Sequence, residues 1–283
     1  IGFHLGKLAS GSGALYLAHW YDWQTSYQMM SLGILPGLFA LLAFRESGTA
    51  NDTAYPHSQT PLRLSIQTLF KHKNIYYIIA FILIFKMSDA VLQGTAATFL
   101  YQLGLTKIEF ANYTKLYGTF WIIIGVTLGG FIVQWLSVYT ATIVAAFVQM
   151  CACLTFSIQA HIGYDPFVLG ISIALENFAS GIVTCTLIAM ISHFVRRSMF
   201  NVSHYTTLYA FGSLSRVSVS VFSGYLAYHM GWTMLYLSLA FLFIPMFFLI
   251  YHLQKEHKKH KVYDKVISFE KDAVYVRSTK AKN

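Results

Sequence analysis

The chain has few charged residues and few cysteines for its length. Of its 283 residues, 11% are Asp, Glu, Lys or Arg, against about 25% in soluble globular domains. So few charges could not cover the surface of a water-soluble protein of this size. Three cysteines cannot build a disulfide scaffold, and the apolar composition excludes a disordered chain. The composition therefore points to an integral membrane protein.

Long apolar segments are abundant instead. Hydrophobic residues make up 56% of the chain, and the mean hydropathy is +0.53. A membrane-spanning helix needs about 20 mostly apolar residues, and eight windows meet that length. Alternating strands are not found, so the expected fold class is all-α, a polytopic membrane protein. The expected spans are 1–20, 24–44, 75–101, 113–137, 140–160, 166–192, 205–228 and 232–252.

Lys and Arg are unequally distributed between the two sides of these spans. Eight crossings place both chain ends on one side. Fifteen of the 20 Lys and Arg lie on that side, in segments 45–73 and 193–204 and in the tail, whereas the opposite loops hold Lys107 and Lys115. Because cytoplasmic loops carry an excess of Lys and Arg, we expect both termini in the cytoplasm. The net charge of +9 then needs no nucleic acid as a partner.

An internal repeat relates two parts of the chain. At an offset of 209 residues, seven pairs of identical residues occur without a gap. The alternative is a compositional bias shared by two aromatic-rich helix pairs. The pairs are Tyr16 and Tyr225, Leu17 and Leu226, Ala18 and Ala227, Trp23 and Trp232, Tyr27 and Tyr236, Pro36 and Pro245, and Phe39 and Phe248.

This repeat predicts the domain organisation. Residues 75–252 form a six-helix bundle, and residues 1–44 form the last two helices of an equivalent bundle. Four further helices, about 130–140 residues, are then expected before Ile1. Segments 45–74 and 253–283 are a cytoplasmic central loop and a basic cytoplasmic tail. Two six-helix halves joined by a cytoplasmic loop resemble the plan of the major facilitator superfamily, with eight of its twelve helices here.

Asp89 is the first candidate for function, because it lies about 15 residues into its span and hence near the bilayer centre. An ionisable group there costs about 2.5–3.5 kcal/mol, so it faces protein or water. A carboxyl group in that position can take up and release a proton. Lys86, three residues earlier on the same helix face, is a candidate for substrate binding or for a purely structural pair with Asp89.

Further ionisable residues lie at similar depth. Glu176 and Arg216 could pair as a gate, or bind polar substrate groups together with Asn177; the alternative is a buried ion pair that fixes helix register. Lys7 could meet an anionic substrate or extend to the cytoplasmic boundary. We therefore expect proton coupling at Asp89 and Glu176, and substrate binding at Lys86, Asn177, Arg216 and Lys7.

Signs of an enzyme or a metal protein are lacking in the sequence. A phosphate loop, a metalloprotease helix and a serine-hydrolase elbow are not found. Cys151, Cys153 and Cys185 lie within predicted spans without a second pair of ligands. We expect no catalytic activity, no metal and no cofactor. Gly125 and Gly129, with Gly118 on the same face, predict a closely packed helix pair instead.

Several of these segments resemble the AmpG-type muropeptide permeases of the major facilitator superfamily. The run KMSDAVLQGTAATFLYQLGLT from Lys86 is similar to the signature of their seventh helix. The segments ALENFASG at 174–181 and SLSRVSVSVFSGYLAYHMGW at 213–232 resemble parts of the tenth and eleventh helices. The resemblance implies proton-coupled import of peptidoglycan-derived muropeptides across the bacterial inner membrane, for cell-wall recycling. It also implies that Asp89 is the acid involved in proton coupling.

Two alternatives stay open at this point. The chain could carry another solute, such as an acetyl-CoA-like or nucleotide-linked compound. It could instead be a non-transporting remnant or an interaction protein, for example one that binds a separate chain supplying four helices. The partners expected for a carrier are the lipid bilayer, protons and a polar solute.

Overall fold

The computed structural model describes residues 6, 9–43, 62–71, 74–196 and 201–256, and every element in these ranges is a helix. The expected all-α class is therefore confirmed. The elements are the π-helix η1 (Ala9–Gly13), α2 (Ala14–Trp20), α3 (Trp23–Leu32), α4 (Leu35–Ala43), α5 (Leu62–Phe70), α6 (Ile75–Gln102), α7 (Lys107–Phe110), the π-helix η2 (Ala111–Tyr117), α8 (Gly118–Trp135), α9 (Val138–Ile162), α10 (Pro166–Val195) and α11 (Asn201–Phe241).

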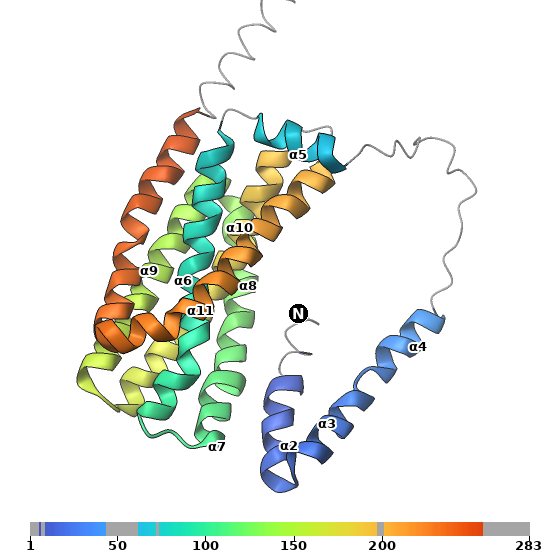
Figure 1. Ribbon diagram of the computed structural model, residues 1–283, viewed down its shortest axis with the longest axis vertical. Coiled ribbons are helices and arrows are strands. Elements are labelled where there is room, and N and C mark those ends of the chain that lie inside the picture. Colours follow the sequence, from blue (N-terminus) through green and yellow to red (C-terminus); the bar gives the residue numbers. More distant parts are fainter. Residues whose placement is uncertain (1–5, 7–8, 44–61, 72–73, 197–200, 257–283) are drawn as a thin grey trace, which may run out of the picture.

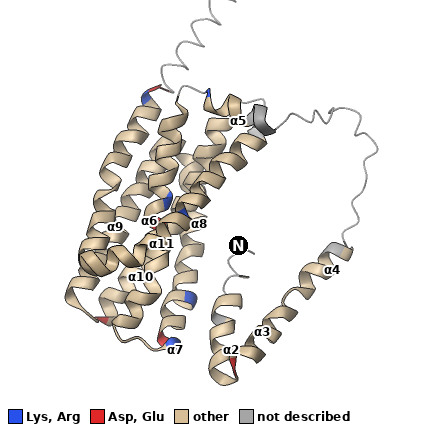
Figure 2. Ribbon diagram, in the orientation of Figure 1, with Lys and Arg blue, Asp and Glu red and all other residues tan. Residues whose placement is uncertain are grey.

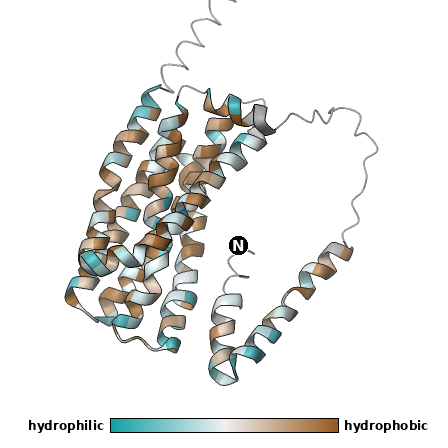
Figure 3. Cartoon of the chain, in the orientation of Figure 1, coloured by the Kyte–Doolittle hydropathy of each residue, from teal (hydrophilic) through white to brown (hydrophobic). Residues whose placement is uncertain are grey.

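Five helices in the described residues are long and apolar enough to cross a membrane, and apolar residues run along their whole length (Figure 3). The last of them contains two predicted spans, because the chain bends at Gly231. The φ angle of Gly231 is 74°, a region that glycine adopts without steric cost. The six spans predicted between 75 and 252 are thus found. The five helices are Ile75–Gln102, Lys107–Trp135, Val138–Ile162, Pro166–Val195 and Val202–Glu256.

Within the two spans expected before residue 45, residues 9–43 form a separate helical hairpin beside the longer helices (Figure 1). Asp22 begins α3, where its carboxylate accepts a hydrogen bond of 2.7 Å from the backbone N–H of Thr25. The second span is divided into α3 and α4 by a turn at Gly33 and Ile34. Pro36 follows this turn, and since proline has no backbone N–H it cannot continue the hydrogen bonding of α3.

The central loop expected at 45–74 contains a short helix, α5. The edge of the Phe70 ring meets Phe211 of α11 at 6.3 Å between centroids, and Thr68 hydrogen-bonds His204 at 3.2 Å. Helix α5 is thereby attached to the beginning of α11. The basic tail after residue 256 lies outside the described residues.

The two repeat segments have matching local structure. The rings of Trp23 and Tyr27 stack at 6.1 Å between centroids and 28°, and those of Trp232 and Tyr236 stack at 6.1 Å and 22°. The helix interruption at 33–34 also recurs 209 residues later, at 242. The two segments thus share local geometry, and a true repeat stays a prediction, because rings four residues apart meet on any helix.

Helices α8 and α10 are in close contact, as the glycine spacing predicts. Gly118, Gly125 and Gly129 are all buried. A Cβ atom on Gly125 would lie 2.2 Å from the carbonyl oxygen of Phe178, and one on Gly129 would lie 3.0 Å from the Cα of Ile182. Only glycine lets the two backbones approach this closely.

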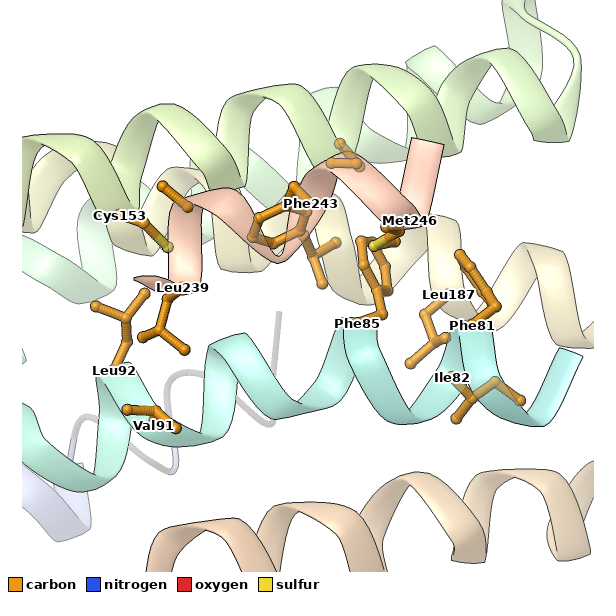
Figure 4. Packing of buried hydrophobic residues seen from close by; sticks show 14 of the residues in the cluster. Phe81, Ile82, Phe85, Val91, Leu92, Cys153, Leu187, Leu239, Phe243 and Met246 are labelled. Carbon is orange, nitrogen blue, oxygen red and sulfur yellow. The ribbon is translucent and has the colours of Figure 1, made fainter. Parts of the chain in front are cut away.

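The interior between α6, α9, α10 and the helical residues after Gly231 is mostly apolar. Phe85, Leu92, Leu239, Phe243 and Met246 point toward one another there (Figure 4). Charged residues are sparse along these helices (Figure 2). The few polar groups buried in this bundle therefore stand out as candidates for function.

Candidate functional site

Asp89 lies in the middle of α6 and is only 5% exposed. Its Oδ1 accepts a hydrogen bond of 2.9 Å from the amide of Gln93, one turn further along the same helix. It also accepts one of 3.1 Å from the hydroxyl of Ser180 on α10. Both donors are neutral, so the carboxylate is held between α6 and α10 without an ion pair to either. This position agrees with the sequence expectation that Asp89 faces protein and not lipid.

Lys86 is half-buried one turn before Asp89, but its side chain packs toward α11. A Cβ atom on Gly212 would lie 3.3 Å from the Cγ of Lys86. Within the described part of the chain the two residues form no ion pair. The structural pair considered from the sequence is thus not formed, and substrate binding by Lys86 stays a prediction.

Glu176 and Asn177 form a second polar group on α10, where Glu176 is 9% exposed. The amide nitrogen of Asn177 donates to the Oε2 of Glu176 at 2.8 Å and to the carbonyl oxygen of Ile173 at 2.9 Å. A Cβ atom on Gly118 would lie 2.8 Å from the same nitrogen. Asn177 therefore orients the Glu176 carboxylate and fills the contact between α10 and α8. Its direct contact with a solute stays a prediction.

Arg216 is exposed on α11 and, among the described residues, makes no ion pair with Glu176. The gate considered from the sequence is therefore not formed in this structure.

An open groove of about 560 Å³ runs along α11. Arg216 lies seven residues after Tyr209 and hence on the same side of the helix as this groove. Hydroxyl groups line part of this groove, and the rings of Tyr205 and Tyr209 stack at 6.2 Å between centroids. The lining residues are Tyr205, Thr206, Tyr209, Ala210, Ser213, Leu214 and Val217.

Lys7, the remaining candidate from the sequence, lies outside the described residues. The structure thus brings Asp89 against α10 and places Glu176 on that same helix, while Lys86 and Arg216 lie toward or on α11. It does not join these candidates into one network of ion pairs among the described residues.

Two residues that hold the Asp89 carboxylate were missed by the sequence reasoning. Gln93 had a signal, because residues four apart meet on one helix face. Ser180 had none, since a serine 91 positions away carries no mark of its contact with Asp89.

Comparison with known proteins supports the assignment reached from the sequence. The sequence pattern of the Major Facilitator Superfamily matches residues 1–215. The chain is 28% identical over 271 residues to the transporter AmpG 3 of Rickettsia prowazekii. This alignment covers 92% of this chain and 64% of that protein. It is 26% identical over 239 residues to the anhydromuropeptide permease of Escherichia coli K12, covering 84% and 48%.

The chain therefore spans between about half and two thirds of the length of these two relatives. The superfamily match includes the hairpin before residue 44 and the helices that carry Asp89, Glu176 and Lys115. With this match over residues 1–215 and its long apolar helices, this chain belongs to the Major Facilitator Superfamily of membrane transporters.

Proposed function

We propose that this protein is a secondary transporter that imports muropeptide-type solutes together with protons. One observation carries the proton coupling: the Asp89 carboxylate is buried in a membrane-spanning helix and bonded to the neutral donors Gln93 and Ser180. An ionisable group within the bilayer faces protein or water and marks a functional site by default. The place of Asp89, between two membrane-spanning helices and bonded to both, therefore supports a role in the transport cycle.

Protonation of Asp89 would also change the contact between two helices. The charged carboxylate accepts a hydrogen bond from Ser180 across α6 and α10, and bonds to a charged acceptor are stronger than bonds to a neutral one. Neutralising the group weakens this contact. A proton therefore has different affinities for states in which α6 and α10 are packed differently, which is the requirement for coupling it to a conformational change.

The nature of the solute is inferred from the relatives and from α11. A relative that is 26% identical is named an anhydromuropeptide permease. The groove along α11 offers hydroxyl groups and a stacked tyrosine pair, with Arg216 on the same side. The groove itself is mainly apolar, so the polar character of the solute is inferred from the relative's name and from Arg216. Glu176 is proposed as a second proton-coupling acid, and Lys7, Lys86, Asn177 and Arg216 as substrate-binding residues.

The proposed location is the bacterial inner membrane, with both termini in the cytoplasm. The support is the concentration of Lys and Arg in segments 45–73 and 193–204 and in the tail.

Uptake by the reconstituted full chain tests this function. We expect proteoliposomes to accumulate radiolabelled anhydromuropeptide when the outside is made more acidic than the inside, and not without the pH gradient. An excess of unlabelled anhydromuropeptide should compete, whereas acetyl-CoA and a nucleotide sugar should not. Accumulation that is blocked by acetyl-CoA or the nucleotide sugar instead would favour another cargo. Accumulation that ignores the gradient would refute proton coupling.

A further inference from the structure

The amide group of Gln149 on α9 is buried and has no hydrogen-bond partner among the described residues. The residue is 1% exposed, and neither its Nε2 nor its Oε1 atom is bonded there. A buried donor or acceptor without a partner loses its hydration and gains nothing in return. Buried polar side-chain atoms therefore nearly always have a partner. An amide with both polar atoms unpartnered points to a ligand that supplies them.

This amide lies near the middle of a membrane-spanning helix. Gln149 is the twelfth of the 25 residues of α9, and the interior that α9 faces is mostly apolar. A side chain in a helix leans over the turn before it, which for Gln149 contains Ala145 and Ala146. Both alanines are fully buried. Their short side chains suit a small ligand beside the amide.

One turn further along α9, Cys153 connects Gln149 to the surroundings of Asp89. Residues four apart meet on one helix face, and Cys153 points into the interior of the bundle (Figure 4). Its Sγ atom lies 3.6 Å from the Oγ atom of Ser88, the residue before Asp89 on α6. Cys153 and Ser88 are both fully buried. Small polar groups thus lead from α6 at Asp89 to Gln149.

The chemistry of the amide identifies the ligand. A glutamine side chain presents two N–H donors and one carbonyl acceptor. A water molecule can accept from the N–H group and donate to the oxygen. Buried waters in proteins make about three hydrogen bonds to groups that otherwise have no partner. A cation would satisfy only the oxygen of Gln149, and an anion only its N–H groups, so water fits the amide best.

We propose that Gln149 binds water inside the bundle, in the path by which Asp89 exchanges its proton with the cytoplasm. Helices α6 and α9 begin on the side of the Lys- and Arg-rich segments 45–73 and 193–204, and Gln149 is one turn nearer that side than Cys153. A water molecule accepts one proton on its oxygen and releases another, so it is unchanged by the transfer. This inference rests on the proposed proton coupling and adds its route.

Radiolytic labelling of the purified full chain tests the water site without relying on transport. X-ray pulses convert water to hydroxyl radicals where it is bound, and these radicals oxidise the nearest sulfur atom. Because Cys153 is fully buried, internal water is what labels it. We expect Gln149→Leu to lower the labelling of Cys153 at least fivefold. Cys185, whose thiol donates to the carbonyl oxygen of Val126, is the internal reference and should be labelled equally in both proteins.

The matched control is Gln159→Leu, which removes an equally buried amide from the same helix. The Nε2 atom of Gln159 donates to the carbonyl oxygen of Gly163 at 2.7 Å, and this variant should leave the labelling of Cys153 unchanged. Gln149→Asn keeps an amide and guards against a folding defect in Gln149→Leu, so it should retain the labelling. Equal labelling of Cys153 in the wild type and Gln149→Leu would overturn the proposal, as would equal losses in the two leucine variants.

Proteoliposomes with a trapped pH indicator test the path. Gln149→Leu should slow acidification driven by anhydromuropeptide at least threefold without slowing the exchange of labelled for unlabelled solute, whereas Gln159→Leu should slow neither. Unchanged acidification in Gln149→Leu would overturn the path. If labelling depends on Gln149 while the wild type does not acidify, the water site stands and the proposed proton coupling does not. If the wild type acidifies while labelling does not depend on Gln149, the proposed function stands and the water site is overturned.

Discussion

Replacing Gly125 with alanine should force α8 and α10 apart. The new Cβ atom would lie 2.2 Å from the carbonyl oxygen of Phe178 and 3.0 Å from its Cα and carbonyl carbon. Favourable carbon contacts are about 3.5–4.0 Å, so the backbones must separate by on the order of 1 Å. Overpacking of this kind costs about 1–3 kcal/mol, and the blocking atoms are backbone atoms, which cannot rotate away.

The matched control is Gly130→Ala on the same helix. A Cβ atom on Gly130 would meet nothing within 4 Å, and alanine is the better helix former by about 0.8–1.0 kcal/mol. We expect this control to be neutral or stabilising. Gly125→Ala should instead lower the free energy of unfolding by about 1–3 kcal/mol, a factor of roughly 5–150 in the equilibrium constant.

Equilibrium unfolding in mixed detergent micelles, followed by tryptophan fluorescence, measures the difference. Trp121 lies one turn before Gly125, with its ring edge-on to Phe178 of α10 at 6.4 Å between centroids. Its emission therefore reports on this helix contact. Equal stabilities of Gly125→Ala and Gly130→Ala would refute the reasoning that glycine is required for close packing of α8 and α10.

Three further predictions concern single contacts. Ser180→Ala removes a hydrogen bond to the buried Asp89 carboxylate and should lower the free energy of unfolding by about 1.5–3 kcal/mol. Ser172→Ala on the same helix should not lower it, because the buried hydroxyl of Ser172 has no partner in the described residues. Gly231→Ala strains a residue at φ 74° and ψ 159° by about 1–3 kcal/mol. Gly224→Ala is the control, because a Cβ atom on either glycine would meet nothing within 4 Å and the φ angle of Gly224 is not positive. Hydrogen bonds from Thr25 lower the pKa of Asp22, so α3 should lose its capping contribution only as pH falls through that lowered pKa.

The same unfolding titrations measure the first two pairs, and equal losses within either pair would contradict the corresponding contact. Hydrogen exchange of the α3 amides between pH 5 and pH 3 measures the third. Asp22→Asn keeps a capping oxygen without the acid titration. Its exchange should therefore not change over this range beyond the intrinsic effect of pH. An identical pH response of the wild type and this variant would show that the carboxylate does not stabilise the beginning of α3.

The spans and the helix contact of α8 with α10 could be predicted from the sequence. A bilayer demands long apolar helices, so hydropathy alone located the six helices between 75 and 252. Close packing demands small residues on one face, so Gly118, Gly125 and Gly129 predicted a buried seam. Both predictions follow from constraints that act along a single helix.

Contacts between helices distant in the sequence could not be predicted in this way. The hydrogen bond from Ser180 to Asp89 depends on the relative rotation of α6 and α10, which neither helix encodes alone. The turn at Gly33 and Ile34 had a visible cause in Pro36, but the apolar window concealed it.

Proton flux driven by the solute is the most direct test of the claim that Asp89 carries the coupled proton. Proteoliposomes containing a trapped pH indicator should acidify inside when anhydromuropeptide is added outside. Asp89→Asn should still exchange labelled for unlabelled solute but produce no acidification. Asp165→Asn is the matched control, because Asp165 caps α10 by accepting from the N–H groups of Phe167 and Val168, and asparagine caps as well. Acidification by Asp89→Asn at the wild-type ratio of protons to solute would contradict the account.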